Sequence, residues 1–288
     1  MSAAARRIDG PNLVEGEYSF TQSDFADIAA MLHADSGIHL PPAKATLVYS
    51  RLAKRLRTLG LESFNAYCAL VGAPEGAEER RSMLAALTTN VTRFFREPHH
   101  FDHLRTQLLP PLLDAARNGG RLRIWSAGCS SGQEPYSIGL TLLGLCPEAT
   151  QLDIRILASD IDPNMVAQAS DGSYGEEAVA AIPLDMRRRW MDQVPAGGWR
   201  MGAALRSLMT FRELNLLGPW PMKGKFDAIF CRNVAIYFEV ETQEKLWGHF
   251  ADHLAPEGRL YIGHSERSNI GRLEPDGLTT YRHAGARS

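Results

Sequence analysis

A loop of small residues follows a short apolar run and ends in an acid and a proline. Residues 126–135 read S-A-G-C-S-S-G-Q-E-P, directly after R-L-R-I-W. In open α/β sheets, a strand that ends in such a turn and enters a helix commonly forms a cofactor cradle. Gly128 and Gly132 would allow close approach of the backbone to a ligand. The match to G-x-G-x-x-G is poor, however, and the loop could be only a tight strand–helix connection.

Two carboxylates indicate what this cradle could bind. Glu134 would repel a phosphate group and suits a cationic amine. Asp160, in A-S-D-I-D at 158–162, follows the next strand, where a carboxylate can accept hydrogen bonds from ribose hydroxyls. Asp160 could instead cap a helix before Pro163, although Asp162 is the better candidate for that cap. An amine-binding acid and a ribose-binding acid, without a phosphate-binding group, indicate S-adenosylmethionine rather than NAD or ATP.

The elements that would position these residues alternate between strands and helices. Apolar runs, separated by helical stretches such as 135–145 and 241–254, occur at 121–127, 152–159, 225–231 and 259–263. This pattern predicts a largely parallel sheet that is covered on both faces. The segment at about 172–214 fits less well, and its W-R-M-G-A and L-M-T-F-R-E stretches predict a small antiparallel insertion.

The N-terminal part of the chain has a different pattern. Apolar residues recur at helical spacing from Phe25 to Leu32, and the following residues up to about 90 predict three more helices and no strand. We therefore expect an N-terminal extension at 1–20, a helical domain at 21–90 and an α/β domain at 91–288.

The overall composition is close to that of an average soluble globular protein. The 288 residues are 44% hydrophobic and carry a net charge of −2, which disfavours a generally nucleic-acid-binding chain. The four cysteines are far apart, which indicates reduced intracellular thiols. No signal core is present, and no stretch approaches the ~20 apolar residues of a membrane helix. We expect a cytoplasmic monomer that does not insert directly into a membrane.

Six stretches of the sequence occur in an order that is typical of one protein family. They are T-T-N-V-T-R-F-F-R-E-P-H-H-F (88–101), W-S-A-G-C-S-S-G-Q-E-P-Y-S-I (125–138), A-S-D-I-D (158–162), N-L-L (215–217), F-D-A-I-F-C-R-N-V-A-I-Y-F (226–238) and G-H-S-E (263–266). From about residue 21 to about 283, the chain resembles the bacterial chemoreceptor glutamate methyltransferases of the CheR family.

The resemblance implies both a fold and an activity. The fold is a Rossmann-like α/β methyltransferase domain with a small antiparallel β subdomain, preceded by an all-α domain that recognises the substrate. The activity is methyl transfer from S-adenosyl-L-methionine to glutamate side chains on the cytoplasmic helices of chemoreceptors, with S-adenosylhomocysteine as the second product. Some members also bind a C-terminal receptor peptide by strand addition to the β subdomain, and this remains open here.

The resemblance also implies roles for particular residues. Together with Gly128 of the loop, the cofactor contacts would be Asn90, Thr92, Arg96, Glu134, Asp160, Asn215, Leu216, Arg232 and Asn233. Arg96 and Tyr237 would lie beside the methyl-transfer centre. Arg96 could instead form a structural ion pair, and Tyr237 could be a core residue of the I-Y-F run.

Methyl transfer from a sulfonium to a carboxylate is an in-line displacement. A glutamate with a pKa of ~4.3 is already ionised near neutral pH, so the reaction needs no general base. Aligning the two reactants can supply roughly 7–11 kcal/mol of the barrier, and Arg96 could orient the incoming carboxylate through charge-assisted hydrogen bonds.

One stretch rich in histidine raises the question of a metal site. His99, His100 and His103 lie close in the sequence, and the last two could share a helix face. We expect no metal there, because no carboxylate or cysteine of that segment completes a ligand set and the reaction needs no Lewis acid.

A basic helix is predicted within 41–60. Leu52, Leu56 and Leu59 share one face, which we expect to pack on the helical domain. The remaining exposed basic residues would face acidic receptor helices, and they are Lys44, Arg51, Lys54, Arg55 and Arg57. The alternatives are a solvated helix face and a nucleic-acid patch, and the net charge weakens the second.

Two other functions remain open from the residues alone. A methyltransferase for nucleic acid or a small acid would keep the sheet motifs but would leave the T-T-N-V-T-R-F-F-R stretch unexplained. A non-catalytic module that senses the cofactor would tolerate loss of Arg96 or Tyr237, yet both residues are present.

Overall fold

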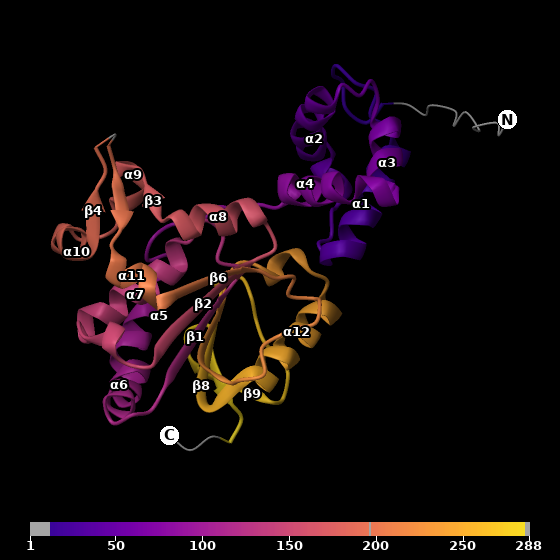
Figure 1. Cartoon of the computed structure of the whole chain (residues 1–288). Helices are drawn as coiled ribbons and strands as arrows, with labels where there is room; N and C mark the ends of the chain where they lie inside the picture. Colours follow the sequence, from indigo (N-terminus) through magenta and orange to yellow (C-terminus); the bar gives the residue numbers. More distant parts are fainter. Residues whose placement is uncertain (1–11, 196, 286–288) are drawn as a thin grey trace. The chain divides into compact units, whose positions relative to one another are not determined.

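The computed structural model describes residues 12–195 and 197–285 (Figure 1). The chain forms two compact units, Met1–Thr89 and Asn90–Ser288. Residues 1–11 of the expected N-terminal extension lie outside the described residues.

The first unit is helical, as predicted. Its helices are α1 (Gln22–Ser36), α2 (Ala45–Leu59), α3 (Phe64–Gly72) and α4 (Ala77–Leu87). Thr21 begins α1 with a capping box, in which its hydroxyl accepts from the Asp24 amide and the Asp24 carboxylate accepts from the Thr21 amide. Phe20, in the expected extension, is fully buried, and its ring centroid lies 4.4 Å from that of Phe64.

Helix α2 packs through the predicted face only in part. Leu52 and Leu56 are fully buried, whereas Leu59 is 39% exposed. Leu59 is the last residue of the helix, and the left-handed Gly60 turns the chain away immediately after it. The expectation that Leu59 packs in the core was therefore wrong.

The second unit contains a seven-stranded sheet in the order β6-β2-β1-β7-β8-β10-β9. The first five strands are parallel, and β10 pairs antiparallel with both β8 and β9. The strands are β1 (Leu122–Ala127), β2 (Ile154–Asp160), β6 (Met209–Glu213), β7 (Phe226–Cys231), β8 (Leu254–Ile262), β9 (Leu273–Gly277) and β10 (Thr280–His283). This topology confirms the prediction of a largely parallel sheet.

Helices cover both faces of this sheet (Figure 1). Alternate residues of each strand point to opposite faces, so Ile124 belongs to one apolar cluster and Trp125 to the other. Helices α6 (Leu109–Arg117) and α7 (Gln133–Leu145) contribute to the cluster of Ile124, and α12 (Val240–His253) contributes to that of Trp125. The second unit also contains α5 (Pro98–His103), which continues through a π-helical turn at Leu104–Leu108, and α8 (Pro163–Asp171).

A small antiparallel sheet is inserted between β2 and β6. Its strands are β3 (Ser173–Tyr174), β4 (Met191–Gln193) and β5 (Trp199–Met201), in the order β3-β5-β4, and short helices α9 (Glu176–Val179), α10 (Leu184–Trp190) and α11 (Ala203–Leu208) accompany them. The M-T-F-R-E stretch was expected in this insertion but forms β6, parallel to β2. Its mixed polar and apolar pattern has another cause, because β6 is an edge strand of the main sheet and is only partly buried.

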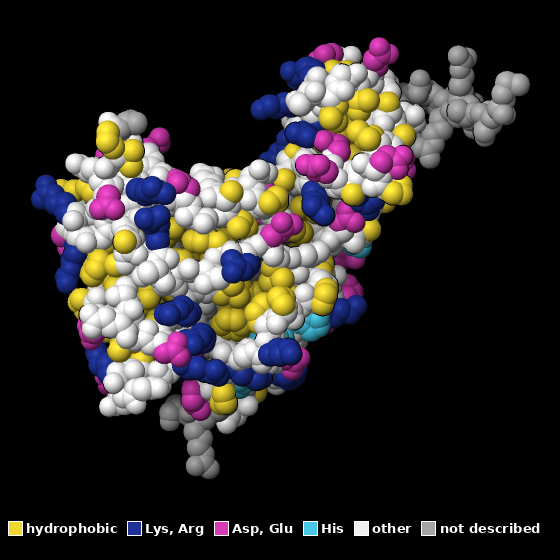
Figure 2. All heavy atoms as spheres, viewed as in Figure 1, with side chains coloured by type: hydrophobic (Ala, Val, Ile, Leu, Met, Phe, Trp, Pro, Cys, Tyr) yellow, Lys and Arg dark blue, Asp and Glu magenta, His cyan; other side chains and the backbone are white. Residues whose placement is uncertain are grey.

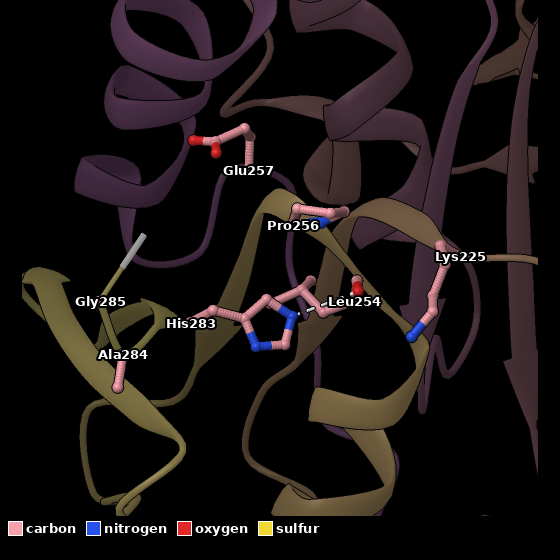
Figure 3. A pocket seen from close by; sticks show the side chains of 7 residues that line it. All are labelled: Lys225, Leu254, Pro256, Glu257, His283, Ala284 and Gly285. Carbon is pink, nitrogen blue, oxygen red and sulfur yellow. Dashed lines mark hydrogen bonds between the residues drawn. The ribbon is translucent and has the colours of Figure 1, made fainter. Parts of the chain in front are cut away.

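The surface of the α/β unit mixes charges of both signs. On the face drawn in Figure 2, Lys and Arg side chains are interspersed with acidic and hydrophobic ones. An open pocket lies where β7 and β8 begin, and Lys225, Leu254 and His283 are among its lining residues (Figure 3). This pocket is at the opposite end of these strands from the predicted cofactor loop. None of the described helices is long and apolar enough to cross a membrane.

Candidate active site

The small-residue loop joins β1 to α7 through two glycines in the left-handed region. Gly128 and Gly132 have φ of 83° and 96°. A Cβ on Gly128 would lie 2.4 Å from Val234 Cγ2, and one on Gly132 would lie 2.7 Å from the Tyr174 hydroxyl oxygen. Both positions therefore require glycine. In this structure, the space beside each glycine is filled by a side chain of the protein itself, Val234 beside Gly128 and Tyr174 beside Gly132.

Glu134 is in the first turn of α7 and is buried. The Ser126 hydroxyl donates to its Oε1 at 2.7 Å, and Arg232 Nε lies 3.3 Å from its Oε2. Burial raises the pKa of Glu134, although the charge of Arg232 and the hydrogen bond from Ser126 oppose that rise. The carboxylate therefore lies in a dry site, where a cationic ligand would be bound strongly.

Asp160 ends β2 beside the same loop. Its carboxylate accepts from the Ser130 amide at 2.7 Å and from the Asp162 amide at 3.0 Å, and burial raises its pKa. Asp162, in contrast, caps α8 by accepting from the Asn164 amide at 2.9 Å. The sequence-based assignment of the cap to Asp162 is confirmed. Asp160 is thus held with its carboxylate at the carboxyl end of the sheet.

Arg232 and Asn233 follow β7 at the same edge. The Arg232 side chain is 2% exposed, its Nη2 donates to the Arg96 carbonyl oxygen, and its Nε is 3.9 Å from Glu97 Oε2. Asn233 has a φ of 59°, and its side-chain amide donates to Glu97 Oε1 at 3.5 Å. One buried guanidinium therefore lies between the carboxylates of Glu97 and Glu134.

Polar atoms without partners at this edge match a zwitterionic ligand. Among the described residues, Arg232 Nε and Nη1 are buried donors without a hydrogen bond, and Asn233 Oδ1 is a buried acceptor without one. An α-amino acid group would supply a carboxylate to Arg232 and an ammonium to Asn233 and Glu134. A carboxylate has about four acceptor sites, so Asp160 retains capacity for ribose hydroxyls. The residues fit S-adenosylmethionine, which supplies the activated methyl group when bound.

The two predicted catalytic side chains are not buried. Arg96 is partly exposed and donates to the Val91 carbonyl oxygen at 3.0 Å, and within residues 12–195 and 197–285 it forms no ion pair. Tyr237 is also partly exposed and ends the 3-10 turn Ala235–Tyr237. The structural alternatives considered for these residues, an ion pair and a core tyrosine, are therefore not what the structure contains.

The remaining predicted cofactor residues lie in loops around this edge. Asn90 donates to Asp162 Oδ2 at 2.9 Å, and its carbonyl oxygen accepts from the Ser130 hydroxyl. Thr92 is partly buried. Asn215 and Leu216 follow β6, and Leu216 is buried. Because β6 is parallel to β2, its carboxyl end brings this pair to the edge that also holds Asp160.

The predicted basic stripe of α2 is only partly free. Lys44, Lys54 and Arg57 are exposed, as expected. Arg51 instead donates to the carbonyl oxygens of Ala86 and Thr88, at 3.1 and 2.6 Å. A separate hydrogen-bonded ion pair joins Arg55 to Glu79. Arg51 therefore binds the end of α4, and Arg55 binds the buried acid Glu79 of the same helix. This corrects the expectation that both arginines are exposed.

Sequence reasoning gave no role to three acidic or polar residues at this edge. Ser126 contacts Glu134, and Glu97 contacts Arg232, as described above. Glu266 is 2% exposed and accepts hydrogen bonds from four backbone amides. The available signal was their presence in the W-S-A-G, R-E-P-H-H and G-H-S-E stretches. The partners of Glu97 and Glu266 lie far away in the sequence, whereas Glu134, the partner of Ser126, is eight residues away.

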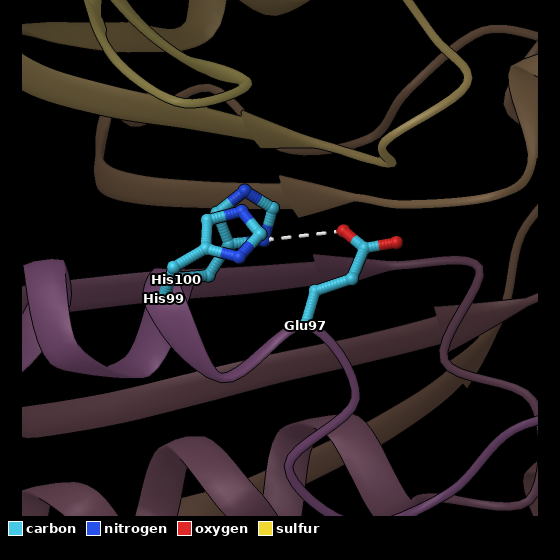
Figure 4. Close-up of side chains that lie close together, drawn as sticks. All are labelled: Glu97, His99 and His100. Atoms are coloured by element: carbon cyan, nitrogen blue, oxygen red, sulfur yellow. Dashed lines mark ion pairs between the residues drawn. The ribbon is translucent and has the colours of Figure 1, made fainter.

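Glu97, His99 and His100 form a compact cluster (Figure 4), with one possible ligand atom from each lying within 4.8 Å of the others. The expectation that no carboxylate completes a ligand set there was therefore wrong. Burial, followed by the charge of Arg232, lowers the pKa of His100 to about 3. The Arg232 guanidinium also lies beside Glu97, so a divalent cation would stand next to a buried positive charge. We assign Glu97 to the Arg232 network rather than to a metal.

A mostly parallel sheet, a glycine turn after its first strand and two buried acids beside that turn are together typical of an S-adenosylmethionine-dependent methyltransferase. The family model for the CheR methyltransferase, SAM binding domain matches residues 90–274, and that for the CheR methyltransferase, all-alpha domain matches residues 23–88. The chain therefore belongs to the CheR methyltransferase family, and its cofactor is S-adenosylmethionine.

Curated relatives agree with this assignment over nearly their whole length. The chain is 53% identical over 259 residues to a probable chemotaxis protein methyltransferase of Rhizobium etli, which covers 88% of this chain and 97% of the relative. It is 41% identical to chemotaxis protein methyltransferase 2 of Pseudomonas aeruginosa, over 87% of this chain and 88% of the relative. It is 39% identical to the chemotaxis protein methyltransferase of Escherichia coli, over 89% of this chain and 87% of the relative.

Proposed function

We propose that this methyltransferase acts in chemotaxis and transfers the methyl group of S-adenosylmethionine to glutamate side chains on the cytoplasmic helices of chemoreceptors. The observation that carries the proposal is the edge of the sheet where Glu134, Arg232 and Asp160 fit the cofactor, with the partly exposed Arg96 and Tyr237 nearby in the same unit. Family membership and the chemotaxis relatives support the choice of substrate.

The reaction needs orientation more than acid–base catalysis. A carboxylate oxygen of the substrate forms a bond to the methyl carbon while the carbon–sulfur bond breaks, and the electron pair of that bond goes to sulfur. The products are a neutral methyl ester and S-adenosylhomocysteine. Arg96, which is partly exposed and has no acidic partner among the described residues, would hold the incoming carboxylate. The Tyr237 hydroxyl would lie beside the reacting groups.

We infer that the helical domain at 21–90 recognises the receptor and that the domain at 91–288 performs the transfer. The exposed cations Lys54 and Arg57 on α2 and Lys44, directly before it, would attract an acidic receptor surface. Reversal of Arg51 or Arg55 would disturb the packing of α4 as well, so Lys54 and Arg57 are the better probes of recognition.

A receptor tail is a second partner that the insertion at about 172–214 could bind. Strand β4 is an edge strand of the small sheet, and an extended peptide could pair with it through backbone hydrogen bonds. Calorimetric titration with C-terminal receptor peptides tests this idea, which fails if no heat of binding is observed.

A labelled-methyl transfer assay against receptor cytoplasmic domains tests the proposed activity. Base-labile label on glutamate is expected, since methyl esters hydrolyse in base. Label on RNA or on a small acid would transfer the protein to a different substrate class, and cofactor binding without any label would favour a non-catalytic sensor. We expect a cytoplasmic monomer in this role.

A further inference from the structure

The G-H-S-E stretch at 263–266 follows β8 and ends in a buried acid with an unusual set of partners. Glu266 Oε2 accepts from the amides of Asn233, at 2.9 Å, and Gly263. Glu266 Oε1 accepts from the amides of Val234 and Ile236, at 3.0 and 3.3 Å. One carboxylate thus collects four backbone donors from two loops, and three of them belong to the loop that follows β7.

That loop carries two residues of the proposed site. Asn233 adopts the left-handed conformation, which is uncommon for a residue other than glycine. The next residues form the 3-10 turn Ala235–Tyr237, and the amides of Val234 and Ile236 lie at its start. Free amides at the start of a turn favour an acidic partner. Glu266 supplies that partner and so holds the segment from Asn233 to Ile236, which directly precedes Tyr237.

The first residue of the stretch leaves room for this arrangement. A Cβ on Gly263 would lie 2.6 Å from Asn233 Nδ2, 2.7 Å from the Asn233 amide nitrogen and 2.7 Å from Glu266 Oε2. His264, which follows Gly263, also takes part, because its amide and ring nitrogens lie 3.3 and 3.0 Å from Glu97 Oε1. Glu97 Oε1 in turn accepts from the Asn233 side chain. The loop after β8 therefore holds Asn233 through its backbone and, by way of Glu97, its side chain.

We propose that Glu266 is a positioning residue for methyl transfer: it holds Asn233 where the amino acid group of the cofactor binds and Tyr237 where the substrate carboxylate reacts. This inference rests on the proposed function. Glu266 is buried behind the loop and acts only through these two residues. A neutral glutamine cannot replace it fully, because one of its two terminal atoms is a donor and would face backbone donors.

The test is Glu266→Gln, with Glu244→Gln on the exposed side of α12 as the matched control. Loss of a charge-assisted acceptor should lower kcat/KM roughly tenfold to 150-fold, and both KM for S-adenosylmethionine and kcat should change. The control should behave as the wild type. Unchanged kinetics in Glu266→Gln would overturn the proposal.

A double-mutant cycle separates positioning from a general loss of structure. If Glu266 acts through Tyr237, Glu266→Gln should lower kcat by less than about threefold in a Tyr237→Phe background, because the hydroxyl that it positions is already gone. Equal losses of kcat in both backgrounds would refute a role in positioning Tyr237. Should Glu266→Gln fold poorly, Gly263→Ala offers a second route, since the added Cβ displaces Asn233 and Glu266 Oε2.

Binding of S-adenosylhomocysteine, measured by calorimetry, tests the Asn233 part without any methyl acceptor. Weaker binding by Glu266→Gln is expected, and wild-type affinity would contradict it. If the wild-type chain binds this ligand but methylates no receptor, the proposed substrate is wrong, while the effect of Glu266 on cofactor binding is still measured.

Discussion

Replacement of Glu134 by glutamine removes a single negative charge from the predicted amine site and leaves its shape nearly unchanged. The glutamine can still accept from the Ser126 hydroxyl, as Glu134 Oε1 does at 2.7 Å. It cannot form an ion pair with an ammonium group or with Arg232, whose Nε lies 3.3 Å from Glu134 Oε2. We expect the variant to fold but to bind the amino acid part of the cofactor poorly.

The magnitude follows from the burial of this carboxylate. Two unit charges about 4 Å apart attract each other by about 4 kcal/mol at an effective dielectric constant of ~20. The cost of desolvating both ions reduces this attraction, and a hydrogen bond to a charged group contributes about 1.5–3 kcal/mol net. At 1.36 kcal/mol for each factor of ten, the Kd for S-adenosylhomocysteine should rise roughly tenfold to 150-fold.

Isothermal titration calorimetry with two ligands measures this effect. S-adenosylhomocysteine carries the amino acid group, whereas 5′-methylthioadenosine has the same ribose and adenine without it. Glu134→Gln should weaken only the first. Asp160→Asn is the matched variant, and it should weaken both ligands. Equal loss of affinity for the two ligands in Glu134→Gln, or no loss for either, would refute the assignment of Glu134 to the amine.

Four other changes should have separable effects. Arg96→Ala should lose most turnover at saturating cofactor, and near-wild-type methylation rates would remove Arg96 from the mechanism. Lys54→Glu with Arg57→Glu should slow receptor methylation at low salt and much less at high salt, without changing urea unfolding of the full chain. Glu79→Gln should instead lower the free energy of unfolding by about 1.5–3 kcal/mol, because Arg55 and the Tyr67 hydroxyl both donate to that buried carboxylate. His100 is neutral in the folded state with a pKa of about 3, so its stabilising contribution is lost as pH falls below ~6.5. At pH 5 the free energy of unfolding of the wild type should therefore be lower by about 2 kcal/mol, a loss that His100→Gln should not show. Equal pH dependence of urea unfolding in the two proteins would contradict this.

Local sequence patterns were enough to predict the architecture. Short apolar runs between helical stretches gave the largely parallel sheet, and helical spacing without strands gave the N-terminal helices. The pattern misled at Met209–Glu213, where partial burial at the sheet edge produces a mixed sequence in a parallel strand. A local pattern reports how many sides of a strand are buried, and it does not report which neighbour the strand pairs with.

Side-chain partners could not be predicted where contact depends on packing. Arg51 and Arg55 looked like members of an exposed stripe, because their partners at the end and in the first turn of α4 lie more than twenty residues further along the chain. Glu97 and Asn233, which share a hydrogen bond, are 136 positions apart in the sequence, and Arg232 directly precedes Asn233. No spacing rule connects residues so far apart, and only the packing of the loop before α5 against the carboxyl end of β7 brings them together.

The sequence by itself determined the α/β class, the glycine turn after β1 and the two acids, Glu134 and Asp160, that point to the cofactor. These features are local, because a strand, its turn and the start of the next helix are contiguous in the chain. Only the tertiary structure decided that Arg232 lies between Glu97 and Glu134 and that Glu266 holds the loop from Asn233 to Tyr237. Parallel strands bring their carboxyl ends to one edge however far apart they are in the sequence, so the partners at that edge are fixed by strand order.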